Sequence, residues 1–226
     1  MPDAPGIRAR NRAALEAEIM AVAGRHLASY GAAALSLRAI ARELGMASSA
    51  IYRYVESRDE LLTRLIIAAF DSLGDAVDAD LEALPAEAAP LDRFRAIASA
   101  TRHWAIRHPH EFALIYGSPV PGYHAPPERT QAAGTRVPLL LVGTLSDGDA
   151  PEPTEAEIRA LGRMAQDEQL ATFAVGPGQL RRGVTAWILV TGAITAELFE
   201  QFGRDTYEPD AFFDLILDDA QRIVTG

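Results

Sequence analysis

Cysteine, lysine and long apolar runs are missing from this chain of 226 residues. Without cysteine it has no disulfide framework, no thiol nucleophile and no thiolate metal site, which fits a reducing compartment. The N-terminus is polar and lacks the apolar segment of a signal peptide, so we expect a cytoplasmic protein. The most apolar stretch, around Trp187, is interrupted by threonines and by Glu197, and we expect no membrane span.

Motifs of enzymatic catalysis are also missing. The sequence contains no phosphate-binding glycine loop, no nucleophile elbow and no paired-histidine metal motif, so we expect neither an enzyme nor a bound cofactor. No pair among the possible metal ligands has the one-face spacing that zinc proteins use on a helix, and we expect no metal site. These candidates are His103, His108, His110, Glu111 and His124.

The net charge of −10 is unevenly distributed along the chain. Residues 1–64 contain nine arginines and seven acidic residues, which gives 9 − 7 = +2. Residues 65–226 contain twelve arginines and 24 acidic residues, which gives 12 − 24 = −12. Because phosphate repels an acidic surface, any contact with nucleic acid is predicted to lie in the first region.

Residues 36–55 have the pattern of two short helices joined by a tight turn. Ser36 is a suitable N-cap, Gly45 can adopt the left-handed conformation that ends a helix, and Ser48 or Ser49 can cap the second helix. The apolar residues recur at helical spacing and are expected to face inward: Leu37, Ile40, Ala41, Leu44, Ile51 and Val55. This arrangement predicts a helix-turn-helix, whose second helix enters the major groove of DNA.

Further features of residues 31–62 follow a known pattern. They include the serine helix start, an Ile-Ala pair, the glycine turn, a Tyr-x-Tyr pair, and Arg58 before an acidic-Leu-Leu sequence. This segment resembles the N-terminal domain of the tetracycline-repressor (TetR) family of transcriptional regulators. It departs from the family at Ala47, where a capping serine is frequent, and at Tyr54, where histidine is common.

The rest of the chain shows no strand-like alternation and is predicted to be all-α. We expect residues 1–10 to be disordered and residues 117–127 and 146–153 to form loops, while Thr154 and Glu157 have the spacing of a capping box. The predicted helices span residues 11–30, 58–84, 90–107, 112–116, 128–145, 154–175, 180–202 and 211–224. The resemblance implies a three-helix DNA-binding head, residues 1–57, followed by a larger helical ligand-binding and dimerisation domain, residues 58–226.

The resemblance also implies which residues meet DNA. A tyrosine hydroxyl can donate to a phosphate, Arg58 adds charge near a helix start, and Arg38 is placed to grip a guanine. The predicted interface consists of Ser36, Arg38, Ser48, Ser49, Ala50, Tyr52, Arg53, Tyr54 and Arg58. The arginines at positions 8, 10 and 12 either touch phosphates as well or only keep a frayed end soluble.

The two C-terminal helices predict self-association. Residues 180–202 and 211–224 are apolar around more of their circumference than a surface helix is. Such helices need a second partner, and in the TetR family the last two helices pair with their copies in a four-helix dimer interface. We therefore expect a homodimer.

The C-terminal domain is also expected to hold an effector. Each of its aromatic residues is more often part of a core than of a pocket, but together they could also line an apolar pocket with a few polar groups. The candidate pocket residues are Thr101, His103, Trp104, Phe112, Tyr116, Phe173, Trp187 and Thr191. The chain is thus predicted to be a repressor that binds palindromic double-stranded operator DNA and is released by a small apolar molecule. A DNA-binding regulator without a ligand and a transcriptional activator remain the alternatives.

Overall fold

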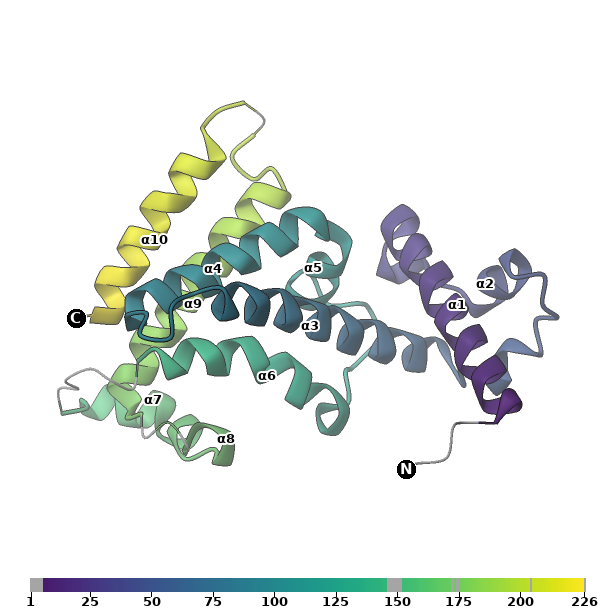
Figure 1. The fold of residues 1–226 in the computed structure, drawn as a ribbon, viewed down its shortest axis with the longest axis horizontal. Helices are drawn as coiled ribbons and strands as arrows, with labels where there is room; N and C mark the ends of the chain where they lie inside the picture. Colours follow the sequence, from purple (N-terminus) through teal and green to yellow (C-terminus); the bar gives the residue numbers. More distant parts are fainter. Residues whose placement is uncertain (1–5, 146–151, 172, 174, 204, 226) are drawn as a thin grey trace. The chain divides into compact units, whose positions relative to one another are not determined.

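The computed structural model describes residues 6–145, 152–171, 173, 175–203 and 205–225, and every regular element within them is helical (Figure 1). The α-helices are α1 (Ile7–Tyr30), α2 (Leu37–Glu43), α3 (Arg58–Glu82), α4 (Pro90–Arg107), α5 (Pro109–Tyr116), α6 (Pro127–Gly143), α7 (Glu155–Ala165), α8 (Glu168–Ala171), α9 (Pro177–Leu198) and α10 (Pro209–Thr225). Two short 3₁₀ helices, η1 (Ala32–Ala34) and η2 (Ile51–Arg53), flank α2. The predicted all-α class is confirmed. In the described ranges no helix is both long and apolar enough to cross a membrane.

The chain divides into two compact units. The head unit comprises residues 1–69 and 110–131, and the body unit comprises residues 70–109 and 132–226. Helix α3 belongs to both, because its first twelve residues, 58–69, lie in the head unit and the rest in the body unit. This division follows packing, whereas the boundary after residue 57 concerns function and stays a prediction.

The head unit has an apolar core. Its buried residues come from α1, the helix-turn-helix and the start of α3: Ile19, Val22, Ala23, Leu35, Leu37, Ile40, Ala41, Ile51, Val55, Leu61, Leu62 and Leu65. Leu114, Val120 and Tyr123, far along the chain, pack against this core. The Tyr123 hydroxyl also lies 2.9 Å from Thr63 Oγ1 on α3, at hydrogen-bond distance. The proline-rich loop after α5 is therefore part of the head unit.

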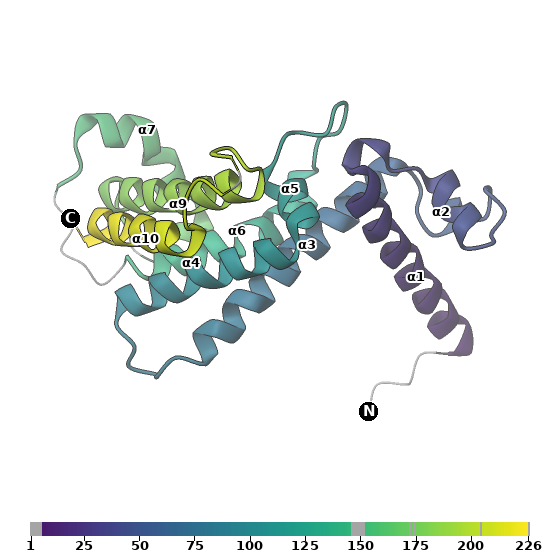
Figure 2. The same cartoon turned by 90° about the horizontal axis from the view of Figure 1, so that it is seen from above.

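In the body unit α4 packs against both α9 and α10, which run alongside each other (Figure 2). Arg102 of α4 is buried and donates hydrogen bonds of 2.7 and 2.8 Å to Glu197 of α9. It also donates one of 2.7 Å to Asp210 of α10 and lies 5.0 Å from the ring centroid of Phe213. The hydrogen bonds with Glu197 raise the pKa of Arg102, so the charge is permanent and ties three helices together.

A glycine permits close packing between α3 and α6 within the body unit. A Cβ added to Gly74 would lie 2.6 Å from the Cδ atom of Arg136. The guanidinium of Arg136 passes over this site and pairs with Asp75, at 2.8 Å, and with Asp78. The missing side chain at position 74 therefore lets the two helices join through this ion pair.

Several predicted boundaries were wrong, most clearly those of α1 and α7. Residues 7–10 form the first turn of α1, because arginine and alanine are good helix formers; residues 1–5 lie outside the described part. The capping box of Thr154 and Glu157 is confirmed, but its helix ends at Ala165 instead of 175. A separate helix, α8, follows from Glu168. The Asp167 carboxylate stabilises its start, because it accepts a hydrogen bond of 2.9 Å from the Gln169 amide. Most of the predicted loop at 146–153 lies outside the described residues.

Candidate nucleic-acid interface and effector pocket

Local hydrogen bonds lock α2 and the turn that follows it. The Ser36 hydroxyl accepts a hydrogen bond of 3.4 Å from the Ala39 amide and caps α2. Gly45 has φ = 66°, a left-handed conformation that costs glycine little. The Met46 amide then donates to the carbonyl of Ala41 at 2.8 Å, so the chain leaves α2 in a fixed direction.

The second helix of the motif is shorter than predicted. Only residues 51–53 are helical, as the 3₁₀ helix η2, and residues 48–50 form a turn. Its hydrogen bonds span three residues, from the Ala50 amide to Ala47 and from the Arg53 amide to Ala50. The prediction that Ser48 or Ser49 caps this helix was wrong, because the N-cap position is Ala50, which carries no side-chain acceptor. The burial of Ile51 and Val55 still fixes which side of the segment faces the solvent.

Arg12 of α1 supports this recognition segment, residues 48–54. Its Nη2 atom donates to the carbonyl of Arg53 at 3.3 Å, and its guanidinium carbon lies 5.6 Å from the ring centroid of Tyr54. Glu16 holds the same guanidinium at 2.9 Å. From the sequence, Arg12 was either a phosphate contact or part of a soluble, frayed end, since nothing local to residue 12 reveals a partner 41 residues away.

Glu43 joins α2 to α1. Its carboxylate accepts a hydrogen bond of 2.8 Å from Arg25 and lies 2.7 Å from Nε2 of His26. The hydrogen bond from Arg25, followed by that from His26, lowers the pKa of Glu43. The first helix of the motif is therefore held in place by polar contacts as well as by the core.

The structure sorts the nine predicted interface residues into two groups. Five side chains are exposed and make no hydrogen bond within the described chain: Arg38, Ser48, Ser49, Tyr52 and Arg53. The other four are at least partly buried: Ser36 caps α2, Ala50 begins η2, Tyr54 packs on the head core, and Arg58 bonds to backbone carbonyls. Their contacts with DNA stay predictions.

Comparison with known proteins supports this interpretation of the helix-turn-helix. Residues 19–65 match the family described as "Bacterial regulatory proteins, tetR family". Residues 94–220 match the family described as "Tetracyclin repressor-like, C-terminal domain", over more than half of the chain. The chain belongs to the TetR family. It is a DNA-binding transcriptional regulator, as its resemblance predicted.

Relatives of known sequence and structure agree with this membership of the TetR family. The HTH-type transcriptional regulator Rv1816 of Mycobacterium tuberculosis is 43% identical over 219 residues, which cover 92% of each chain. A crystal structure assigned to a regulatory protein, SCO4313, has 30% identity and a TM-score of 0.80 and covers 96% of this chain and 98% of its own. The TetR family regulator PfmR of Thermus thermophilus, with 17% identity, a TM-score of 0.52 and coverage of 92% and 97%, shares the fold.

The predicted pocket residues of the family's ligand domain are spread over several elements. Thr101 and Trp104 on α4 are buried; Thr101 Oγ1 donates to the Ile97 carbonyl at 2.7 Å and Trp104 Nε1 to Ser72 Oγ at 3.0 Å. Phe112 and Tyr116 are neighbours in the head unit, with ring centroids 5.1 Å apart, and burial raises the pKa of Tyr116. Phe173, Trp187 and Thr191 are half-buried in the body unit. The structure therefore does not gather the whole predicted set around one pocket.

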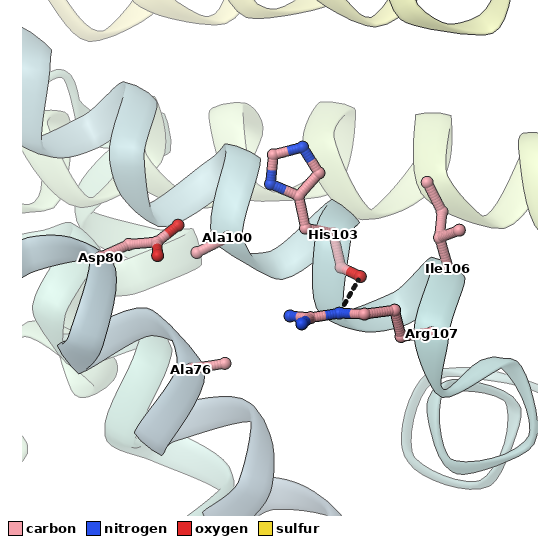
Figure 3. Close-up of a pocket in the computed structure, with 6 residues that line it drawn as sticks. All are labelled: Ala76, Asp80, Ala100, His103, Ile106 and Arg107. Atoms are coloured by element: carbon pink, nitrogen blue, oxygen red, sulfur yellow. Dashed lines mark hydrogen bonds between the residues drawn. The ribbon is translucent and has the colours of Figure 1, made fainter.

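A pocket of about 450 Å³ lies between α3 and α4 in the body unit. Its lining comes from Ala76 and Asp80 on α3 and from Ala100, His103, Ile106 and Arg107 on α4, which Figure 3 shows. Arg107 lies along its own helix, because its Nε atom donates to the His103 carbonyl at 3.1 Å. Only His103 belongs to the predicted set. The others were missed because the sequence does not show which faces of two helices meet.

A second depression, of about 490 Å³, lies between α3 and α6 and includes Phe173, Leu139 and Leu140 in its lining. Neither depression gathers acidic or histidine side chains in the manner of a metal site. Across the described part of the chain no three His, Asp or Glu residues come together as metal ligands would.

Proposed function

We propose that this regulator is a homodimeric repressor that binds a palindromic operator in the cytoplasm and is released by a small apolar molecule. The observation that carries the DNA-binding part is the exposed polar row formed by Arg38, Ser48, Ser49, Tyr52 and Arg53 on a firmly held helix-turn-helix. Arginine and serine can read base edges, and tyrosine can donate to a phosphate.

Exposed apolar side chains support the homodimer. Ile188 on α9 and Leu215 on α10 are each 62% exposed, and Phe199 and Phe202 lie at 43% and 55% near the end of α9. Such side chains on two adjacent helices form a surface that a second copy would cover. A stable interface of this kind buries on the order of 2,000 Å² in total.

The α3–α4 pocket supports a small effector. Ala76 and Ala100 leave room, Ile106 adds apolar surface, and Asp80 and His103 offer polar contacts. Helix α3 lines the pocket at residues 76 and 80 and begins at Arg58 in the head unit. A ligand that shifts α3 against α4 would thus act on the helix that leads to the DNA-binding residues. Nothing in this arrangement points to turnover of the ligand.

A two-stage experiment tests the proposal. The wild-type protein selects binding sites from random duplexes, and we expect palindromes whose half-sites lie about one helical turn apart or slightly more. Small apolar compounds are then screened for a shift in melting temperature. By linkage, a true inducer binds less tightly when the selected duplex is present. Equal affinity with and without DNA would show that the compound is no inducer, and non-palindromic sites would contradict the paired heads.

A further inference from the structure

Arg58, the first residue of α3, uses most of its hydrogen-bonding capacity inside the protein. Its Nε atom donates to the Leu35 carbonyl at 3.2 Å. Its Nη2 atom donates to the carbonyls of Ala32 and Ala33, at 3.0 and 3.1 Å. The side chain is only 32% exposed. Three of the five N–H groups of the guanidinium are therefore committed to backbone oxygens.

The three carbonyls belong to one short segment. Residues 32–35 form η1 and the residue after it, and they connect α1 to the Ser36 cap of α2. Arg58 thus joins the start of α3 to the start of α2, across 23 to 26 residues of sequence. The planar fork of a guanidinium suits this task, because it holds several oxygens in a fixed geometry.

We propose that Arg58 is a positioning residue that fixes α2 to α3, and that it does not contact phosphate. Only the Nη1 edge remains, and Asp59 Oδ1 lies 3.9 Å from that atom. The carbonyl dipoles and this carboxylate offset the positive charge that a phosphate would meet. Arg38 and Arg53, by contrast, are exposed and have no side-chain hydrogen bond within the described residues.

A consequence concerns the effector response. Because α3 continues into the body unit, a movement of α3 acts directly on residues 32–35 through Arg58. The orientation of α2, and with it the exposed face of Arg38, then follows α3. The proposal rests on DNA binding by the chain and is independent of which effector moves α3.

Charge and geometry can be separated by two substitutions. Arg58→Lys keeps the charge but loses the fork, and Arg58→Gln loses both. Arg42→Gln removes an exposed arginine of α2 that has no side-chain hydrogen bond in the described chain, so it is the matched control for loss of charge. Affinities are measured for a duplex selected by the wild-type protein and for a scrambled duplex, at several salt concentrations, after correction for the active fraction by stoichiometric titration.

We expect both Arg58 variants to lose roughly tenfold or more in affinity for the selected duplex, because the hydrogen bonds of a charged group are strong. Affinity of Arg58→Lys for scrambled DNA should stay within about twofold of wild type, and the salt slope of Arg58→Gln should be unchanged. A loss of stability alone would lower the active fraction but not the corrected ratio of specific to non-specific affinity.

The opposite pattern would overturn the proposal. A phosphate contact predicts wild-type affinity for Arg58→Lys, together with a loss on both duplexes and a slope flatter by about one unit per half-site for Arg58→Gln. Amide hydrogen exchange of residues 37–43 in the free protein is a second readout that needs no DNA. Exchange there should accelerate in both variants and not in Arg42→Gln, and unchanged exchange would equally refute the positioning role. If the wild type selected no sequence, the exchange measurement would decide alone.

Discussion

Three arginines of the head unit and three of the body unit differ in their ion pairs. In the head unit Arg38, Arg42 and Arg53 are exposed and have no ion pair among the described residues. In the body unit Arg95, Arg102 and Arg136 each bridge two acidic side chains. Cations without partners are available to an anionic ligand, whereas paired cations hold helices together.

Exposed apolar side chains also distinguish the helix-turn-helix from the last two helices. Large apolar side chains exposed on α9 and α10 belong to the body unit, whereas the outward face of the helix-turn-helix is polar. The two proposed partners, operator DNA and a second copy of the chain, therefore have separate candidate surfaces. We therefore expect that a substitution in the body unit can abolish self-association without altering the residues that bind DNA. A substitution in the head unit should likewise weaken DNA binding without altering the apolar residues of α9 and α10.

The largest effect is expected from a charge in the apolar face of the body unit. Leu215→Asp should raise the dissociation constant of the dimer about a hundredfold or more, because an unpaired carboxylate would be buried at the interface. The protomer should stay folded, since Leu215 is 62% exposed. Sedimentation velocity at micromolar concentration measures the effect, and circular dichroism checks the fold.

Ile106→Asp is the matched control, because Ile106 is also exposed, at 43%, but lies on α4. It should remain dimeric. A dimer of unchanged affinity in Leu215→Asp, or a monomeric wild type, would refute the assignment of the apolar face to self-association.

The sequence predicted the helices better than it predicted the contacts between them. The helices were found from local signals, such as the Thr154–Glu157 capping box, which needs only residues 154–157. The family resemblance picked out Arg58 but could not supply its partners, which lie 23 to 26 residues upstream and are brought close by the packing of α3 on the head core. That Asp80 and Arg107 line the same α3–α4 pocket likewise depends on helix packing. Local structure was therefore predictable, and tertiary contacts were not.

The next largest effect is expected from removing a buried, paired arginine of the body unit, compared with a more exposed one. Arg102→Met should lower the free energy of unfolding by about 3 kcal/mol, because it leaves Glu197 partly buried without its partner. Arg95→Met removes an arginine that is 38% exposed and should cost about 1 kcal/mol or less. Urea unfolding monitored by circular dichroism compares the two. Equal losses would show that burial does not decide the role of these ion pairs.

A smaller effect tests the unpaired arginines of the head unit. If Arg38 grips a guanine, Arg38→Ala should cost about 1–3 kcal/mol per half-site and relax the preference at one base position. Tyr52→Phe is the comparison, because it removes only a hydroxyl and should weaken all sequences alike with little change in salt slope. Binding to a selected duplex and its single-base variants measures both. If Arg38→Ala weakened every variant by the same factor, Arg38 would be a phosphate contact.

The smallest effect concerns Glu157, an acidic residue that is assigned neither to DNA binding nor to self-association. The Thr154 amide donates to Glu157 at 2.8 Å and Arg181 adds an ion pair at 2.6 Å, which together lower the pKa of Glu157 to about 2. Because the folded-state pKa is below the unfolded value of 4.5, this carboxylate stabilises the fold above pH 4.5, and its contribution is lost as the pH falls through about 2. Glu157→Gln should therefore be less stable than wild type at neutral pH, and the difference should vanish near pH 2.

Carboxyl carbon NMR gives the direct measurement of this last prediction. The titration midpoint of Glu157 should lie near 2 in the wild type and rise in Thr154→Ala, because the capping threonine supplies the hydroxyl hydrogen bond. Glu155, also in the first turn of α7 and 92% exposed, provides the control, since Glu155→Gln removes a charge without touching the capping box. Thermal unfolding of the two glutamine variants across this pH range should separate them. A Glu157 midpoint near 4.5 would mean that neither the capping box nor Arg181 holds its carboxylate in solution.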